Sequence, residues 1–245
     1  MNEPNGPAQQ AHAIHTPVLI DCSSSIRTNG LLPGLIEAAN ETLAELRKAE
    51  SLVSVVYFNH EIGVSVWRRP ARDVPPFSEF NVPIDGGTYL YRAITMTVNR
   101  LIAEHDESKG ETNADVNIMV FTDGLDSSSM DPSYMGPTLM DARLALGNAR
   151  GRGFRVTFVT AVDGLASDLG ISQRDTILIS ASPKGVREGF RQATMRIGTE
   201  DLRRAAEAMR LDREAKARAE AAAAPQPAPP PAEPAKKRRP WWRFW

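Results

Sequence analysis

The chain has 245 residues, a formal net charge of −1 and 42% hydrophobic residues, which allow one large α/β domain plus appendages. No apolar run reaches 18 residues, so we expect no membrane-spanning helix, and residues 1–15 do not resemble a secretory signal. The single cysteine, Cys22, excludes an intrachain disulfide and is expected to lie in the core. These features favour a cytoplasmic location.

The first half of the chain alternates between strand and helix patterns. Residues 1–13 are expected to be disordered, and the apolar residues 18–20 predict a buried strand. Leucine, isoleucine and alanine at helical spacing predict a helix over 33–49. Residues 52–58 and 62–67 predict a hairpin, which would place one antiparallel edge strand on an otherwise parallel sheet.

The second half continues this alternation. Helices are expected over 89–105 and 138–151, and strands over 116–121 and 154–162. Three shorter elements follow: a helical turn over 166–169, a strand over 177–180, and a helix over 183–196 that Gly198 interrupts. Residues 14–198 are therefore predicted to form a Rossmann-like α/β domain, with helices on both faces of a mostly parallel sheet.

The remaining residues differ from the domain in composition. Residues 199–224 alternate Arg, Glu, Lys and Ala, which predicts an exposed, salt-bridged single helix. Residues 225–235 are rich in Pro and Ala and predict an extended, semi-rigid linker. The last ten residues, 236–245, form a tail that holds five cations, four aromatic residues and no acid. These are Lys236, Lys237, Arg238, Arg239, Trp241, Trp242, Arg243, Phe244 and Trp245.

The composition of this tail predicts an interaction element. Without its ten residues the chain has 24 basic and 30 acidic residues, so a body of charge −6 carries a strongly basic end. Tryptophan rings favour an interface, and Lys and Arg favour anionic headgroups. An anionic membrane surface and an aromatic pocket of a partner protein both fit, nucleic acid fits less well, and an inert tail is a further alternative.

Oxygen-bearing side chains follow the first predicted strand. Asp21, Ser23 and Ser25 alternate along the loop at its carboxyl end. Carboxylates and hydroxyls are hard ligands, which suit Mg²⁺, Mn²⁺ or Ca²⁺ rather than Zn²⁺. Such a short motif is weak evidence by itself, because aspartates and hydroxyls also cap helices and fill turns.

Two later segments strengthen this prediction. Thr88 precedes a predicted helix and follows Gly86 and Gly87, which would let the backbone approach a ligand closely. Asp123 follows the strand predicted over 116–121. Because ligands of open α/β sheets lie outside the carboxyl ends of the strands, we expect all three segments to converge there.

With these segments the chain resembles the von Willebrand factor A (vWA) domain and its metal-ion-dependent adhesion site. The motif of that family matches Asp21, Ser23, Ser25, Thr88 and Asp123. The resemblance covers residues 14–197, is closest to small stand-alone bacterial proteins, and implies a three-layer α/β/α vWA fold. One departure is Ser24, where the family usually has glycine, so the loop must keep a negative φ at this position.

The resemblance also implies a function. The three hydroxyls would coordinate Mg²⁺ directly, and the two aspartates directly or through water. A carboxylate of a partner protein could then replace a water on the ion, which makes the domain a protein-binding module. The alternatives are a membrane-surface scaffold that acts through the tail and a metal-dependent hydrolase.

Two further observations bear on these alternatives. The sequence lacks the motifs of serine hydrolases, zinc proteases, nucleotide-binding loops and dinucleotide-binding folds. We therefore expect that the protein is not an enzyme. Four polar residues follow the second ligand-bearing strand: Asp126, Ser127, Ser128 and Asp131. They predict either a solvated loop or a rim that shapes the choice of partner.

Overall fold

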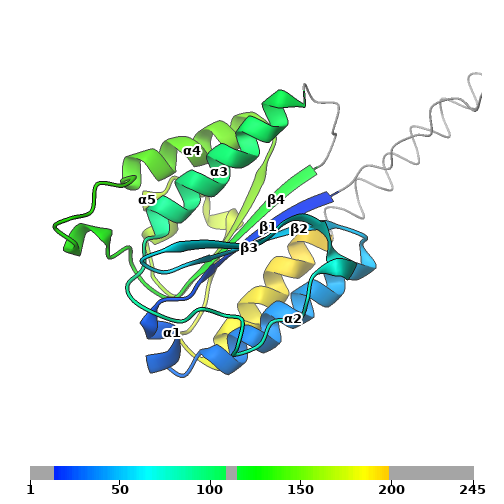
Figure 1. Cartoon of the computed structure of the whole chain (residues 1–245), viewed down its shortest axis with the longest axis horizontal. Helices are drawn as coiled ribbons and strands as arrows, with labels where there is room; N and C mark the ends of the chain where they lie inside the picture. The colour runs from blue at the N-terminus through cyan, green and yellow to red at the C-terminus, as the bar shows by residue number, and fades with distance from the viewer. Residues whose placement is uncertain (1–13, 109–114, 199–245) are drawn as a thin grey trace, which may run out of the picture. The chain divides into compact units, whose positions relative to one another are not determined.

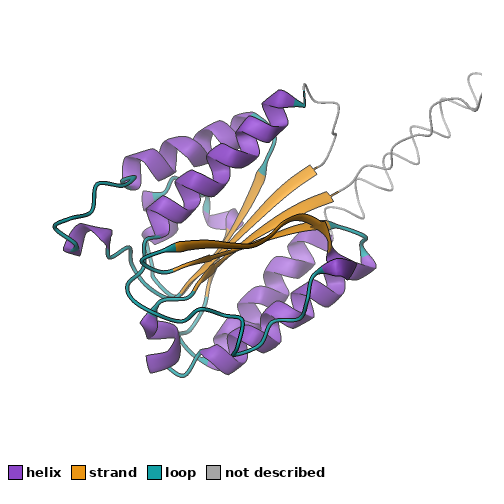
Figure 2. Ribbon diagram, in the orientation of Figure 1, coloured by secondary structure: helices purple, strands orange, loops and turns teal. Residues whose placement is uncertain are grey.

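A six-stranded sheet forms the centre of the domain, in the order β3-β2-β1-β4-β5-β6 (Figures 1 and 2). The structure, a computed structural model, describes residues 14–108 and 115–198. The strands are β1 (Ile14–Asp21), β2 (Leu52–Phe58), β3 (Ile62–Pro70), β4 (Asp115–Thr122), β5 (Arg155–Thr160) and β6 (Thr176–Leu178). All neighbours pair in parallel except β2 and β3, so the predicted antiparallel edge strand is confirmed.

Helices cover both faces of this sheet. They are α1 (Ser24–Thr28), α2 (Leu32–Lys48), α3 (Leu90–Glu107), α4 (Leu139–Gly151), α5 (Leu165–Asp168) and a last helix over 183–198. In Figure 1, α3 and α4 lie on one face, while α2 and the yellow helix over 183–198 lie on the other. The predicted three-layer α/β/α arrangement is confirmed.

Each face of the sheet has its own core because successive side chains of a strand point to opposite faces. On β1, Leu19 packs towards α3 and α4, whereas Val18 and Ile20 pack towards α2. The rings of Phe121 and Phe190 lie 5.1 Å apart in the core on the α2 face, where they join β4 to the last helix. Burial of such a ring stabilises the fold by about 2 kcal/mol.

The structure corrects some of the expected boundaries. β1 begins four residues before the predicted strand, at Ile14, and β5 ends at Thr160 rather than at residue 162. The helix α1 was not predicted, because five residues are too few to show helical periodicity. The last helix reaches residue 198, two residues beyond its predicted end, and the predicted interruption at Gly198 concerns residues that lie outside the described ones.

Four predictions lie outside the described residues: those for 1–13, 199–224, 225–235 and the tail. Between residues 14 and 198, leaving out 109–114, no helix is both long enough and apolar enough to cross a membrane.

Candidate functional site

The candidate site lies at the carboxyl ends of β1 and β4. Ile20 of β1 is in register with Phe121 of β4, so the residues that follow them are neighbours. Asp21 is the last residue of β1 and is 0% exposed. The Thr122 hydroxyl donates a 2.6 Å hydrogen bond to Asp21 Oδ2, and the next residue, Asp123, is half-buried.

A chain of hydrogen bonds joins four of the five predicted ligands. The Ser23 N–H donates to Asp21 Oδ1 at 2.8 Å. The Ser23 and Ser25 hydroxyls are 2.9 Å apart, and the Ser25 hydroxyl donates to Asp123 Oδ1 at 2.8 Å. The structure therefore brings both serines between the two aspartates.

Ser23 does not perform the alternative role of a helix cap. It is the residue before α1, where serine hydroxyls commonly accept a backbone N–H. Its hydroxyl makes no such bond and faces Ser25 instead. Ser24 begins the helix and is absent from the positive-φ residues of the described chain, so its backbone has the negative φ that the motif requires.

Thr88 lies on the loop that precedes α3. A Cβ atom added to Gly124 would lie 4.0 Å from Thr88 Oγ1, so this hydroxyl faces the residue that follows Asp123. The hydrogen bonds that join the other four residues do not include it. The structure thus brings Thr88 to the same edge of the sheet without linking its side chain to the other four.

Backbone hydrogen bonds hold this loop against the residues after β1. The Ser24 N–H donates to the Gly86 carbonyl at 3.0 Å, and the Asp85 N–H donates to the Cys22 carbonyl at 2.9 Å. Cys22 is fully buried, as predicted, and burial raises the pKa of its thiol. The buried cysteine and its neighbours thus fix the loop that carries Thr88.

Side chains of the next loop complete this support. The Ser127 hydroxyl accepts the Thr88 N–H at 2.8 Å. Asp126 Oδ2 accepts the Tyr91 N–H at 3.0 Å, and Asp131 Oδ2 accepts the Tyr89 hydroxyl at 2.6 Å. These side chains position the loop before α3, so the loop over 126–137 is more than a solvated connection.

The structure gives a reason for glycine at positions 86 and 87 that the sequence did not indicate. Gly86 has φ +60, and a Cβ atom there would lie 1.9 Å from His60 Nδ1. A Cβ atom on Gly87 would lie 2.5 Å from Ser127 Oγ. Gly86 therefore requires glycine, because of its positive φ and the His60 ring, whereas a side chain at Gly87 would displace the Ser127 hydroxyl.

The electrostatics of the site fit a hard divalent cation. Burial raises the pKa of Asp21 to about 6, hydrogen bonds from Thr122 and Ser23 oppose this rise, and the nearby Asp123 adds to it. Neither aspartate has an ion-pair partner among the described residues. Two neighbouring acids and three neutral hydroxyls are the ligands that Mg²⁺ and Mn²⁺ prefer.

This ligand set contains only two carboxylates. Accordingly, residues 14–108 and 115–198 contain no group of three or more His, Cys, Asp or Glu side chains placed to hold a metal. Hydroxyls supply three of the five donors at the candidate site, so its charged side chains are only the two aspartates. The residues present therefore fit a divalent cation through their oxygen chemistry.

Sequence reasoning missed two residues that hold the predicted ligands, Thr122 and Asn29, and gave a third, Ser127, only as part of a solvated loop or a rim. Thr122 contacts Asp21, Asn29 donates to Asp123 Oδ2 at 3.3 Å, and Ser127 holds the Thr88 backbone. Only Thr122 carried a usable signal, because it lies next to Asp123 at the end of a strand. Asn29 could not be placed without α1, which brings it back towards the site.

Comparisons with known proteins identify the fold. No protein-family model and no curated protein matches the chain. Among solved structures, it is similar to the VWA domain of SpRpn10 (TM-score 0.54, 13% identity), covering 74% of this chain and 95% of that one. The pilus adhesin SpaC from Lactobacillus rhamnosus GG (TM-score 0.60, 12% identity) matches over 77% of this chain. Proximal thread matrix protein 1 from the mussel byssus (TM-score 0.54, 13% identity) matches over 74%.

These similarities define the class of protein by its fold. The chain spans 31% of the adhesin's length and 47% of that of the mussel protein, but nearly all of the separate VWA domain. Residues 14–198 have the fold of a von Willebrand factor A domain, as the sequence predicted. At 12–13% identity, the likeness concerns the fold alone.

Proposed function

We propose that the domain binds a divalent cation, Mg²⁺ or Mn²⁺, and through it captures an acidic group of a partner protein. The observation that carries the proposal is the hydrogen-bonded chain from Asp21 through Ser23 and Ser25 to Asp123. Asp21, Ser23, Ser25, Thr88 and Asp123 would hold the ion. The presence of this fold in a pilus adhesin supports a role in protein binding.

The chain's own residues define how capture would work. When bound, the cation supplies a positive charge that a carboxylate can approach. Asp21 is fully buried and fixed by Thr122, so it anchors the inner side of the site. Ser25 and Asp123 are only half-buried, so a ligand from outside could reach an ion that they hold.

Titration calorimetry with MnCl₂ and MgCl₂ tests the cation. Wild type is expected to bind and to gain thermal stability, because a ligand that binds only the folded state stabilises it. Asp123→Ala should lose this binding, because it removes one of the two carboxylates that would hold the ion. Asp73→Ala, which removes an acid of the short helical turn after β3, is the control and should bind as wild type does.

A pull-down with and without EDTA tests the capture of a partner. Proteins retained by wild type in Mg²⁺ should be released by EDTA and should not bind Asp123→Ala. Retention that is equal in EDTA would contradict the role of the cation. A turnover that depends on the metal and is lost in Asp21→Ala would instead favour the alternative of a hydrolase.

A further inference from the structure

Exposed apolar side chains gather after β4. Among the described residues, ten large hydrophobic side chains are exposed, and half of them lie between residues 125 and 144. These are Leu125 (62% exposed), Met130 (83%), Met135 (95%), Met140 (68%) and Leu144 (63%). In Figure 1 the green loop over 123–138 runs outward from the end of β4 before it returns to α4. Apolar side chains that gather on a surface, rather than lie scattered, mark an interaction site.

The backbone of this loop is held in place although its apolar side chains are exposed. The Ser127 N–H donates to the Thr88 carbonyl at 2.8 Å. The rings of Tyr134 and Tyr89 lie 4.8 Å apart, and the Tyr134 hydroxyl donates to the Pro137 carbonyl at 3.0 Å. A loop that is already ordered loses little conformational entropy when it binds a partner. The exposed side chains therefore form a preorganised surface.

This surface is continuous with the candidate metal site. Asp123 is the first residue of the loop, and Leu125 follows it by two positions. The loop is also tied to Thr88 by its Ser127 side chain and backbone. A partner whose carboxylate approached an ion at Asp123 would therefore meet the apolar side chains of the same loop.

The charge of the loop limits what such a partner can carry. Beyond Asp123, residues 124–142 hold three acids, Asp126, Asp131 and Asp141, and no Lys, Arg or His. Their recorded hydrogen bonds come from neutral N–H and O–H donors, so these bonds leave the negative charges uncompensated. Arg92 of α3, whose charge acts on Tyr134, offsets only one of them. The excess of acid favours a partner with basic side chains.

We propose that the captured segment of the partner carries apolar and basic side chains beside its carboxylate. This inference rests on the proposed function, because it names the partner of the same site. The apolar side chains cover Leu125, Met130 and Met135, whose flexible thioethers adapt to aliphatic and aromatic groups. The basic side chains lie in the negative field of the loop. The tail over 236–245 holds no acid, so it lacks the group that the site would capture, and a partner protein is the occupant.

Selection from a random peptide library on the full-length protein in MnCl₂ tests the proposal without assuming a sequence. Wild type should enrich peptides in which Asp or Glu stands near Leu, Met or Phe and near Lys or Arg. If calorimetry shows that Mn²⁺ is bound but the selected peptides have acids alone, or none is enriched, the inference is overturned while cation binding stands. If no Mn²⁺ is bound, the proposed function itself fails.

A double variant, Met130→Ser with Met135→Ser, tests the role of the loop. Anisotropy of a labelled peptide from the selection should show binding about ten-fold weaker than with wild type. Mn²⁺ affinity should stay unchanged, because neither side chain is a proposed ligand. The control, Met96→Ser with Met195→Ser, removes two methionines that are 50% and 55% exposed on helices of the two faces, and it should bind as wild type does. Equal binding by the two double variants would overturn the inference.

Two further measurements test other occupants of the loop. Dimers of the wild type that the variant Met130→Ser with Met135→Ser does not form would assign the loop to a second copy of the chain. A synthetic peptide with the sequence of residues 236–245 should not displace the selected peptide. Displacement would assign the loop to the tail, and either result would overturn the assignment to a partner protein.

Discussion

The Thr122 hydroxyl donates a 2.6 Å hydrogen bond to Oδ2 of Asp21, which joins the carboxyl ends of β4 and β1. Both residues are fully buried, so bulk solvent does not reach this contact. The bond also fixes the orientation of the carboxylate whose other oxygen accepts the Ser23 N–H. Thr122 is therefore a positioning residue of the candidate site.

Thr122→Val tests this relationship. The change keeps the shape of the side chain and leaves a buried carboxylate oxygen without its donor, so the free energy of unfolding should fall by about 2 kcal/mol. Mn²⁺ binding should also weaken. Thr16→Val on β1 is the control, because Thr16 Oγ1 is buried without a hydrogen-bond partner among the described residues. Its stability should stay equal or rise; a loss as large as that of Thr122→Val would contradict the argument.

Ser127→Ala tests whether the loop after β4 positions Thr88. The substitution removes the acceptor of the Thr88 N–H, so it should weaken Mn²⁺ binding. The free energy of unfolding should fall by about 1 kcal/mol. Ser133→Ala serves as the control in the same loop, since among the described residues its hydroxyl bonds to Asp131 and not to Thr88. If both variants bind Mn²⁺ as wild type does, Ser127 has no part in the site.

Periodicity predicted most of the fold, because the strands and helices bury regular apolar patterns. Residues 52–58 were predicted with the bounds that β2 has. α1 was not predicted, since its one buried apolar residue, Ile26, gives no periodicity. β1 extends back to Ile14 through His15 and Thr16, which pair with neighbouring strands although they are polar.

The sequence predicted which residues form the candidate site but not the hydrogen bonds that hold them in place. The sequence placed Asp21 and Asp123 at strand ends, because apolar runs precede both. It could not show that Thr122 points to Asp21, since a threonine at this position is also an ordinary strand residue. The role of Ser127 depends on the path of a loop, which periodicity does not determine.

The tail over 236–245, which lies outside the described residues, gives a prediction about membranes. Its five cations should attract an anionic surface by about 1 kcal/mol each, and its aromatic rings add burial that salt does not screen. Liposome flotation should therefore recover wild type with anionic lipids. A variant with Trp241, Trp242 and Trp245 changed to Ala should float less. If the two proteins float equally, the aromatic rings contribute nothing to membrane binding. If neither protein floats, the tail does not bind membranes.

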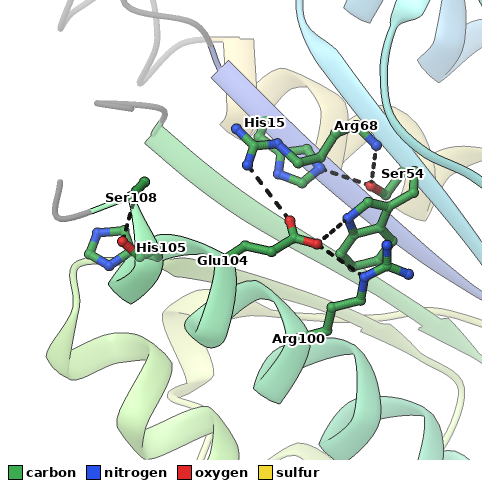
Figure 3. Close-up of polar contacts among 8 residues, drawn as sticks. His15, Ser54, Arg68, Arg100, Glu104, His105 and Ser108 are labelled. Atoms are coloured by element: carbon green, nitrogen blue, oxygen red, sulfur yellow. Dashed lines mark hydrogen bonds and ion pairs between the residues drawn. The ribbon is translucent and has the colours of Figure 1, made fainter. Parts of the chain in front are cut away.

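His15 provides a prediction about pH. Figure 3 shows its ring beside Ser54, whose hydroxyl lies 2.9 Å from His15 Nε2 and also accepts the Arg68 N–H at 2.9 Å. The Ser54 proton is thus available to the imidazole nitrogen, which suits a neutral ring. Burial, and then the charge of Arg68, lowers the pKa of His15 from 6.5 to about 3.

The sign of the effect follows from linkage. Between pH 6.5 and pH 3 the unfolded chain binds a proton at this histidine and the folded chain does not. The contribution of His15 to the free energy of unfolding is therefore complete above pH 6.5 and falls as the pH is lowered. Between pH 7.5 and pH 5 the loss should be about 2 kcal/mol.

Urea unfolding of wild type and His15→Gln at pH 7.5 and pH 5 measures this contribution. Asp21, whose pKa is raised to about 6, acts in the opposite direction over part of this range. It is present in both proteins, so the difference between their pH dependences isolates His15. The variant should lose about 2 kcal/mol less than wild type on acidification. If the free energy of unfolding falls equally in the two proteins, the folded protein takes up the His15 proton as readily as the unfolded chain does. That result would contradict the argument from the burial of the ring against Trp67 and Ser54.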